Sequence, residues 1–292
     1  MSPLKNVHKS PLLRKVCLPL LKRFNPGDIR IRHHYTREPF HLHCYRHKGY
    51  WYHGRRRERR TMDFFAAAIR PGDVVAEVGG HIGYIAAYYA SLVGPGGKVV
   101  VFEPGSNNLP YLHKNLSSHG WVEIVEQAVS DQPGEATFFE ENLTGQNNSL
   151  HADYDVFQSN RSRAYDNEGY APRSVQVTTL DRHFGADLAP PNLIKIDVEG
   201  AELSVLHGAD RLLTEHQPVV MVEVTREKGA VYEWLSGRGY HLYDDRGRAL
   251  LSGDDFDFNV CALHPERHEE LLGRLGWRSP LTLAQAGRHA AA

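Results

Sequence analysis

From residue 61 onward, short apolar runs alternate with segments of helical spacing, and this alternation limits the fold more than any other feature. "VVAEVGG", "KVVVFEP", "VEIVEQAV", "LIKIDV" and "VVMVEV" have the β-branched composition of buried strands. Helical spacing is found in "TMDFFAAAI", "IGYIAAYYASLV", "NNLPYLHKNLSSHG", "GAELSVLHGADRLLTEH" and "GAVYEWLSGRG". "YHLYDD" and "FNVCALH" add two strand-like pieces at the end. The pattern predicts an α/β fold, a doubly wound and mostly parallel sheet covered on both faces.

Three segments fall outside this alternation. Residues 1–60 form a basic N-terminal extension, in which the leucines and other apolar residues of 12–24 have the spacing of a short amphipathic helix. Residues 142–173 are a polar insertion within the predicted domain of residues 61–265, and we interpret them as a substrate loop. Residues 266–292 are expected to form a C-terminal helix and a frayed tail.

The net charge of −1 hides an uneven distribution of charge. Residues 1–60 hold 16 Lys and Arg against 3 Asp and Glu, whereas the rest of the chain holds 18 against 32. A basic segment of this kind attracts an anionic carrier, such as a phospholipid-linked glycan or a carrier protein. The alternative is that it packs against the acidic body or against a second subunit of a homo-oligomer.

Cysteine usage and hydropathy bear on the compartment. Cys17, Cys44 and Cys261 lie far apart, with no CxxC pair for zinc or redox chemistry. No apolar run approaches the ~18 residues of a membrane span, and Lys15 and Lys22 break up the short apolar patches that a signal peptide would need. We therefore expect a protein without a transmembrane segment, in the cytoplasm.

The strand "NLIKIDVEG" carries charges that a buried strand does not normally tolerate. Lys195, Asp197 and Glu199 alternate with apolar residues, so a continuous strand would place all three on one face. Burying an unpaired charge is unfavourable by several kcal/mol. The trio therefore indicates a functional site, and the alternative is an ion pair that only fixes the strand.

A glycine-rich loop follows the first predicted strand. Gly79 and Gly80 allow a sharp turn, and Gly83 allows the next helix to begin close to the sheet. The spacing is not the GxGxxG of dinucleotide-binding loops, and the carboxylate of Glu77 just before the turn would repel phosphates. A cationic ligand such as S-adenosylmethionine suits it better. Glu103, at the end of the second strand, is placed to accept hydrogen bonds from ribose hydroxyls.

Four segments together resemble the FkbM family of S-adenosylmethionine-dependent methyltransferases, across roughly residues 70–245. They are "EVGGHIGY", "VFEP" with Asn107 and Asn108 after it, "EQAVSDQPGEATF" and "NLIKIDVEGAELSVLHGA". The resemblance implies a seven-stranded, Rossmann-like class I methyltransferase sheet and O-methylation of a saccharide, glycolipid or polyketide-type natural product. The first motif departs from the family pattern, because Glu77, Gly80 and His81 replace its Asp, Ala and Asn.

Methyl transfer to a hydroxyl requires polar groups near the methyl group, which hold the acceptor and remove its proton. We assign Asp197 to orienting the cofactor or acting as base, and Glu199 to the acceptor hydroxyl or a metal. Lys195 completes the catalytic set by balancing Asp197. On the substrate side we add Glu223 from the next strand, together with Asn148 and Ser149 from the insertion, to which a small-molecule or glycan acceptor would bind.

The cofactor set follows the strand ends. Besides Glu103, Gln127 and Ala128 end the third predicted strand and are expected beside the adenine, a placement that the resemblance supports. The remaining members are Glu77, Gly79, Gly80, Gly83, Tyr84, Pro104 and Asn108.

Two metal sites and two rival functions complete the interpretation. Asp197 and Glu199 offer hard oxygen ligands for Mg²⁺, whereas a zinc site at His41, His43 and His47 lacks a second ligand pair. A nicotinamide-dependent oxidoreductase is disfavoured by the glycine spacing. A non-catalytic module that uses the basic "GRRRERR" of residues 54–60 is the other alternative, but we expect no nucleic-acid partner, because Glu58 interrupts the run and the pI is about 7.0.

Overall fold

The computed structural model describes residues 23–141, 144–146, 148–150, 170–185 and 187–278. The chain divides into two compact units, Met1–Arg57 and Glu58–Ala292. The C-terminal tail beyond residue 278 and most of the predicted helix over residues 12–24 lie outside the described residues.

The described part of the first unit, residues 23–57, contains a two-stranded antiparallel hairpin and two short helical segments. Its elements are β1 (Asp28–Arg32), β2 (Pro39–His43), α2 (Lys48–His53) and the 3-10 turn η2 (Gly54–Arg56). Both ring nitrogens of His43, one of the suggested zinc ligands, have partners within this unit. Its Nδ1 accepts from the Arg46 amide at 3.1 Å, and its Nε2 lies 3.3 Å from Asn25 Nδ2. Among the residues that the structure describes, no group of three or more His, Cys, Asp or Glu is arranged to hold a metal ion.

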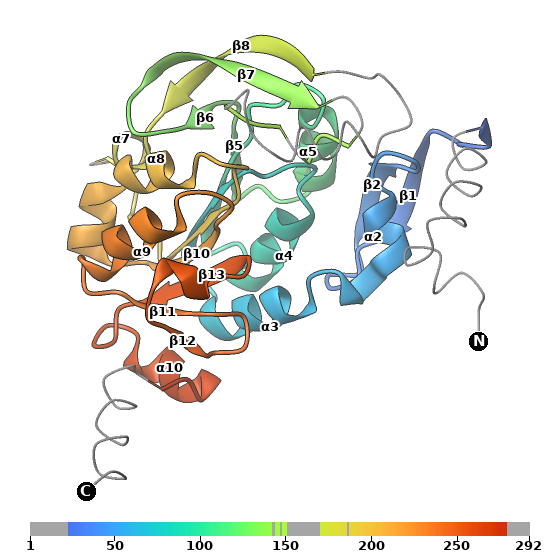
Figure 1. The fold of residues 1–292 in the computed structure, drawn as a ribbon. Helices are drawn as coiled ribbons and strands as arrows, with labels where there is room; N and C mark the ends of the chain where they lie inside the picture. Colours follow the sequence, from blue (N-terminus) through green and yellow to red (C-terminus); the bar gives the residue numbers. More distant parts are fainter. Residues whose placement is uncertain (1–22, 142–143, 147, 151–169, 186, 279–292) are drawn as a thin grey trace, which may run out of the picture. The chain divides into compact units, whose positions relative to one another are not determined.

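The second unit is built on an eight-stranded sheet with the order β12-β11-β13-β10-β9-β3-β4-β5 (Figure 1). Five strands are parallel: β3 (Val74–Val78), β4 (Lys98–Phe102), β5 (Val122–Val125), β9 (Leu193–Ile196) and β10 (Val219–Glu223). β13 (Asn259–Leu263) is antiparallel to β10 and pairs with β11 (His241–Tyr243). The predicted doubly wound sheet is confirmed, with the two-residue β12 (Ala249–Leu250) as an eighth strand that was not anticipated.

Helices cover both faces of this sheet. The helical elements are α3 (Arg59–Ala68), α4 (Tyr84–Val93), α5 (Leu109–Leu116), α7 (Leu180–His183), α8 (Glu202–His207), the π-helix η3 (Leu212–His216), α9 (Lys228–Ser236), the 3-10 turn η4 (Gly253–Asp255) and α10 (Glu269–Leu275). Alternate strand residues such as Val78 and Ile196 pack with Val205 of α8 and Val231 of α9 in one buried core. Figure 1 shows α8 and α9 on one side of the strands and α4 on the other.

A separate three-stranded sheet, with the order β6-β8-β7, adjoins the insertion. Its strands are β6 (Ala128–Val129), β7 (Gly134–Glu141) and β8 (Tyr170–Thr178). Two predictions were wrong here. The single strand expected over "VEIVEQAV" is divided between β5 and β6, which belong to different sheets, and the last four residues assigned to the insertion belong to β8.

The single helix predicted over residues 200–216 is also interrupted. It ends at His207, and a π-helix begins at Leu212. The carboxylate of Asp181 accepts from the Arg211 and Leu212 amides at 2.8 and 2.9 Å, and so supplies partners to the donors that start the second segment. This capping side chain lies 30 residues upstream, so local helical spacing could not reveal it.

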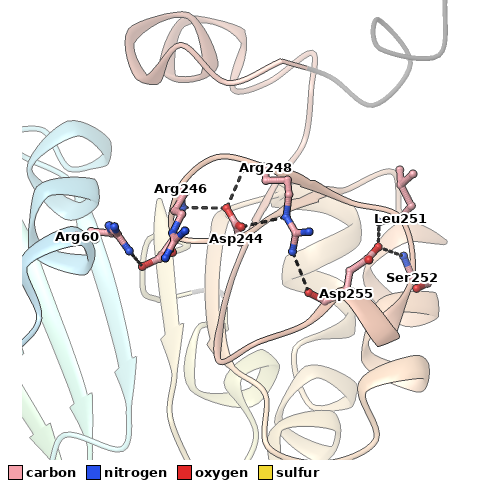
Figure 2. Close-up of polar contacts among 8 residues, drawn as sticks. Arg60, Asp244, Arg246, Arg248, Leu251, Ser252 and Asp255 are labelled. Atoms are coloured by element: carbon pink, nitrogen blue, oxygen red, sulfur yellow. Dashed lines mark hydrogen bonds and ion pairs between the residues drawn. The ribbon is translucent and has the colours of Figure 1, made fainter. Parts of the chain in front are cut away.

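Ion pairs fix the turn between β11 and β12 at the edge of the large sheet (Figure 2). Arg60 of α3 bonds Asp245 at 3.1 Å, and Arg248 bonds Asp244 at 3.2 Å. Asp255 accepts from the amide of Leu251 at 2.9 Å and so closes the next loop. The charged residues of this edge are therefore largely engaged with one another.

Candidate active site

The strand order places the candidate site. From β3 the chain proceeds to β4 and β5 on one side, whereas β9 and β10 lie on the other side, so the order reverses between β3 and β9. Ligands of open α/β sheets bind at the carboxyl ends of the strands at such a point. Residues 79–83 follow β3, Glu103 follows β4, residues 197–200 follow β9, and Glu223 ends β10.

Two positions in the glycine loop exclude any side chain. Gly79 has φ +91°, and a Cβ there would lie 1.9 Å from the carbonyl oxygen of Asp197. Gly80 has no room because a Cβ would meet Val101 Cγ1 at 2.2 Å. The loop therefore packs directly on the tip of β9, and Tyr84 begins α4 immediately after it as a buried residue.

His81 occupies a left-handed backbone conformation, with φ +47°. Asn and His are among the few non-glycine residues enriched there, which accounts for a histidine where the family pattern has Asn. Its amide donates to Glu103 Oε2 at 2.7 Å, and its ring Nε2 lies 3.2 Å from the Thr144 carbonyl oxygen. The loop is thus fastened to the next strand tip.

The carboxylate of Glu103 is held by three donors. Oε2 accepts from the His81 amide, and Oε1 accepts from the Gly105 amide at 2.8 Å and from Asn108 Nδ2 at 3.2 Å. Burial raises the pKa of Glu103 to about 7, although all three donors favour the ionised form and oppose that rise. A carboxylate has about four acceptor sites and these three bonds leave Oε2 with only one partner, so Oε2 keeps capacity for a ligand hydroxyl.

Glu77 lies within the sheet rather than at an open strand tip. It is 1% exposed and is the direct neighbour of Lys195 in the parallel pairing of β3 with β9. Burial raises its pKa to about 8, and the charge of Lys195 opposes the rise. Its Oε2 has no hydrogen-bond partner among the described residues, so a buried acceptor is available to a cationic ligand group or a water molecule.

The expected ion pair between Lys195 and Asp197 is present, with Nζ 2.7 Å from Oδ2. Burial disfavours the ammonium charge, but Asp197 and Glu77 outweigh burial and raise the pKa of Lys195 above its ordinary value. The prediction that the strand continues to Glu199 was wrong. β9 ends at Ile196, and Glu199 adopts φ +50°, which takes it out of the extended conformation.

Glu223 brings a further carboxylate to this site from β10. Met221 is the neighbour of Lys195 in the pairing of β9 with β10, so Glu223, two residues later, lies on the same face. The charge of Asp197 and then burial raise the pKa of Glu223 to about 8. Glu199 and Glu58 raise it further, and Lys195 lowers it, so these five charged groups share one environment.

The residues proposed for substrate contact on the insertion have other partners. Asn148 accepts from the Glu141 amide at 2.7 Å and donates to Asn107 Oδ1 at 3.0 Å. Ser149 is 0% exposed, and its hydroxyl donates to the Glu199 carbonyl oxygen at 2.8 Å. Both side chains therefore have hydrogen-bond partners within the protein, and their contact with an acceptor stays a prediction.

Of the remaining cofactor candidates, two lie near the end of β4 as expected, and two lie beyond the end of β5. Pro104 comes two residues after the end of β4, and Asn108 is 1% exposed and donates to both Glu103 and the Gly145 carbonyl oxygen. The third strand ends at Val125, four residues before the end of the predicted "VEIVEQAV", so Gln127 lies in the connection and Ala128 begins β6.

Sequence reasoning missed two buried groups. Glu202 is 1% exposed, and its Oε1 accepts from the Gly200 amide at 2.8 Å and from Thr225 Oγ1 at 2.7 Å. Tyr89 of α4 is fully buried, its hydroxyl has no hydrogen-bond partner among the described residues, and burial followed by the charges of Glu77 and Asp197 raises its pKa. An acidic residue in the first turn of a helix was the one available signal for Glu202.

The magnesium site suggested for Asp197 and Glu199 lacks support. Within the described ranges no third acidic, His or Cys residue joins them in an arrangement that could hold a metal ion. These residues can act without a metal ion. Asp197 is paired with Lys195, and further carboxylates surround the tip of β9.

Comparisons with known proteins identify the family. An alignment of 248 positions with AMB antimetabolite synthetase AmbE of Pseudomonas aeruginosa shows 28% identity and covers 72% of this chain but only 11% of that protein. A structure of methyltransferase FkbM from Methylobacillus flagellatus is similar over 69% of this chain and 50% of that one, with 17% identity and a TM-score of 0.41. A putative rRNA-methylase from Clostridium thermocellum is similar over 70% of this chain and 93% of that one, with 13% identity and a TM-score of 0.41.

The family assignment rests on a match to the methyltransferase FkbM domain over residues 77–242, more than half of the chain. The match begins at Glu77, includes both strand-tip carboxylates Glu103 and Glu223, and ends within β11. It replaces the nicotinamide oxidoreductase interpretation with methyl transfer dependent on S-adenosylmethionine. This chain therefore belongs to the FkbM family of methyltransferases.

Proposed function

We propose that the chain transfers a methyl group from S-adenosylmethionine to a hydroxyl of a saccharide, glycolipid or polyketide-type acceptor. The observation that carries the proposal is the Glu103 carboxylate, which three N–H groups hold at the tip of β4 beside the glycine loop. A carboxylate in this position suits the two ribose hydroxyls of the cofactor.

The charges around the tip of β9 suit a cationic cofactor. Glu77, Asp197 and Glu223 lie around one cation, Lys195, which is already bonded to Asp197. The unsatisfied Oε2 of Glu77 is an acceptor for an ammonium group, whose positive charge would lower the pKa of Glu77 and favour its ionised form. When bound, S-adenosylmethionine supplies an electrophilic methyl group on a sulfonium and leaves as S-adenosylhomocysteine after an in-line displacement.

The protein must hold the acceptor oxygen behind that methyl group and remove its proton as the oxygen–carbon bond forms and the carbon–sulfur bond breaks. We assign proton removal to Glu223, because a base is most effective when its pKa lies near the working pH, and that of Glu223 is about 8. Asp197 is committed to Lys195 and serves to orient the reacting groups. Glu199 has the role of holding the acceptor hydroxyl.

Calorimetric titration of S-adenosylhomocysteine tests the cofactor half of this proposal. Glu103→Gln should weaken binding by a hundredfold or more, because hydrogen bonds to a charged acceptor contribute about 1.5–3 kcal/mol each. The matched control is Glu215→Gln, an exposed glutamate in η3, which should bind like the wild type. Equal affinity in Glu103→Gln and the wild type would reject the assignment of Glu103.

The acceptor half requires a screen of glycans and polyketide-type alcohols by formation of S-adenosylhomocysteine. Repeating each assay with and without Mg²⁺ shows whether the reaction needs the metal ion or is catalysed by protein side chains alone. Methyl transfer only to amines or to nucleic acid, with hydroxyl acceptors inert, would contradict the proposed reaction.

A further inference from the structure

One peptide group beside the proposed catalytic carboxylates is held at both of its ends. The carbonyl oxygen of Glu199 accepts from Ser149 Oγ at 2.8 Å, and the amide of the next residue, Gly200, donates to Glu202 Oε1 at 2.8 Å. Both partner side chains are buried, with Ser149 0% and Glu202 1% exposed. Solvent therefore does not compete for either hydrogen bond.

This peptide group has an unusual conformation. Glu199 has φ +50° and Gly200 has φ +101°, so two consecutive residues lie in the left-handed region. A non-glycine residue there is strained by about 1 kcal/mol or more and persists only when its surroundings hold it. The two buried hydrogen bonds supply that restraint.

The partner on the carbonyl side is itself firmly anchored. Ser149 exchanges backbone hydrogen bonds of 2.8 and 3.2 Å with Phe139 of β7. Its neighbour Asn148 bonds the Glu141 amide and Asn107, and Thr144 and Gly145 contact His81 and Asn108 through their carbonyl oxygens. Residues 144–146 and 148–149, which we call the bridging segment, thus connect the loops after β3, β4 and β9.

The partner on the amide side is anchored as well. Glu202 Oε1 also accepts from Thr225 Oγ1 at 2.7 Å, and Thr225 lies two residues after Glu223. Burial raises the pKa of Glu202, and the hydrogen bonds from Gly200 and Thr225 oppose that rise. The loop after β9 is therefore linked to the loop after β10 as well as to the bridging segment.

From this geometry we propose that Ser149 and Glu202 are positioning residues, which clamp the Glu199–Gly200 peptide and thereby direct the Glu199 carboxylate towards Asp197 and Glu223. The inference rests on the proposed function only for the role of Glu199. The clamp gives Ser149 a task other than the acceptor contact expected from sequence, and it gives Glu202 a task where none was expected.

Two acceptor-independent measurements test the clamp in the intact chain. Ser149→Ala and Glu202→Ala should each speed amide hydrogen exchange at Gly200 about tenfold, the effect of losing one hydrogen bond. Glu202→Gln keeps an acceptor oxygen at the same position and should retain slow exchange. Ser117→Ala is the matched control, because Ser117 also donates to a backbone carbonyl, that of Lys114 at 3.0 Å, but lies at the end of α5.

The second measurement is titration of the Glu223 carboxyl by ¹³C NMR. Asp197, Lys195, Glu199 and Glu58 are the charged groups that act on it. Releasing Glu199 in Ser149→Ala should lower the Glu223 titration midpoint by roughly half a pH unit, as a like charge moves away. A role in folding alone would leave the midpoint of the folded variant unchanged.

The clamp is overturned if Ser149→Ala matches Ser117→Ala and the wild type in both measurements. Should Ser149→Ala fail to fold, Ser149→Cys, which keeps the size but donates weakly, replaces it, and exchange as slow as in the wild type would count against the clamp. Titration with S-adenosylhomocysteine separates the two proposals. Absence of binding in the wild type rejects the proposed function, whereas the exchange and NMR results still decide whether the clamp exists.

Discussion

Replacing Glu77 by Gln should change how the stability of this protein depends on pH. Glu77 is 1% exposed, and burial raises its pKa from the ordinary value of 4.5 to about 8. Between these two pH values the folded chain binds the proton and the unfolded chain does not. The free energy of unfolding therefore falls as the pH rises through this interval, and the penalty is complete above about pH 8.

The expected size follows from the two pKa values. Each pH unit within the interval contributes up to about 1.4 kcal/mol, so this one carboxyl accounts for about 5 kcal/mol over the whole interval. Glu77→Gln imitates the protonated form with nearly the same shape and cannot lose a proton. The stability of the wild type relative to the variant should therefore decrease by about 2–3 kcal/mol between roughly pH 5.5 and pH 7.5.

Urea denaturation followed by circular dichroism at several pH values measures this difference. Comparing the two proteins removes the contributions of Glu103 and Glu223, which titrate in the same region in both. For Glu215→Gln, at an exposed position, the free energy of unfolding should depend on pH in the same way as in the wild type. The difference in the free energy of unfolding between the wild type and Glu77→Gln is the test. If it changes by less than about 0.5 kcal/mol over this pH range, Glu77 is ionised in the folded chain and its raised pKa is refuted.

Three further predictions give separate tests. Gly79→Ala should destabilise the fold by more than about 2 kcal/mol in urea denaturation, because it combines a positive φ with overlap on the Asp197 carbonyl, whereas Gly96→Ala, with nothing within 4 Å, should have little effect. His81→Gly should be more stable than His81→Ala by about 1 kcal/mol. Both variants lose the ring contact, but only glycine tolerates φ +47° freely. Equal stabilities of the two variants would show that the backbone at position 81 is not strained. In the wild type, kcat/KM for an acceptor found by screening should rise tenfold per pH unit and level off near pH 8, and a similar rise in Glu223→Gln would show that another group is the base.

The sequence determined the large features of this protein because they depend on local periodicity. Apolar runs and helical spacing were sufficient for the order of strands and helices, and the doubly wound sheet follows from their alternation. The glycine loop was predicted for the same reason, since Gly79 has a positive φ that its residue type allows. The pairing of Lys195 with Asp197 was also expected, because residues two apart on a strand share a face.

Only the tertiary structure decided the details of the site, because they depend on residues far apart in the chain. β9 ends at Ile196, and the peptide after Glu199 is held by Ser149, 50 residues away. Asn107, which accepts from the Asn148 amide, lies 41 residues before it, so a polar segment expected to contact an acceptor forms its hydrogen bonds within the protein. The pKa values of Glu77 and Glu223 near 8 arise from burial and from neighbouring strands. A sequence pattern records which side chains share a face of an element, whereas burial and the electric field at a carboxyl are properties of the assembled sheet.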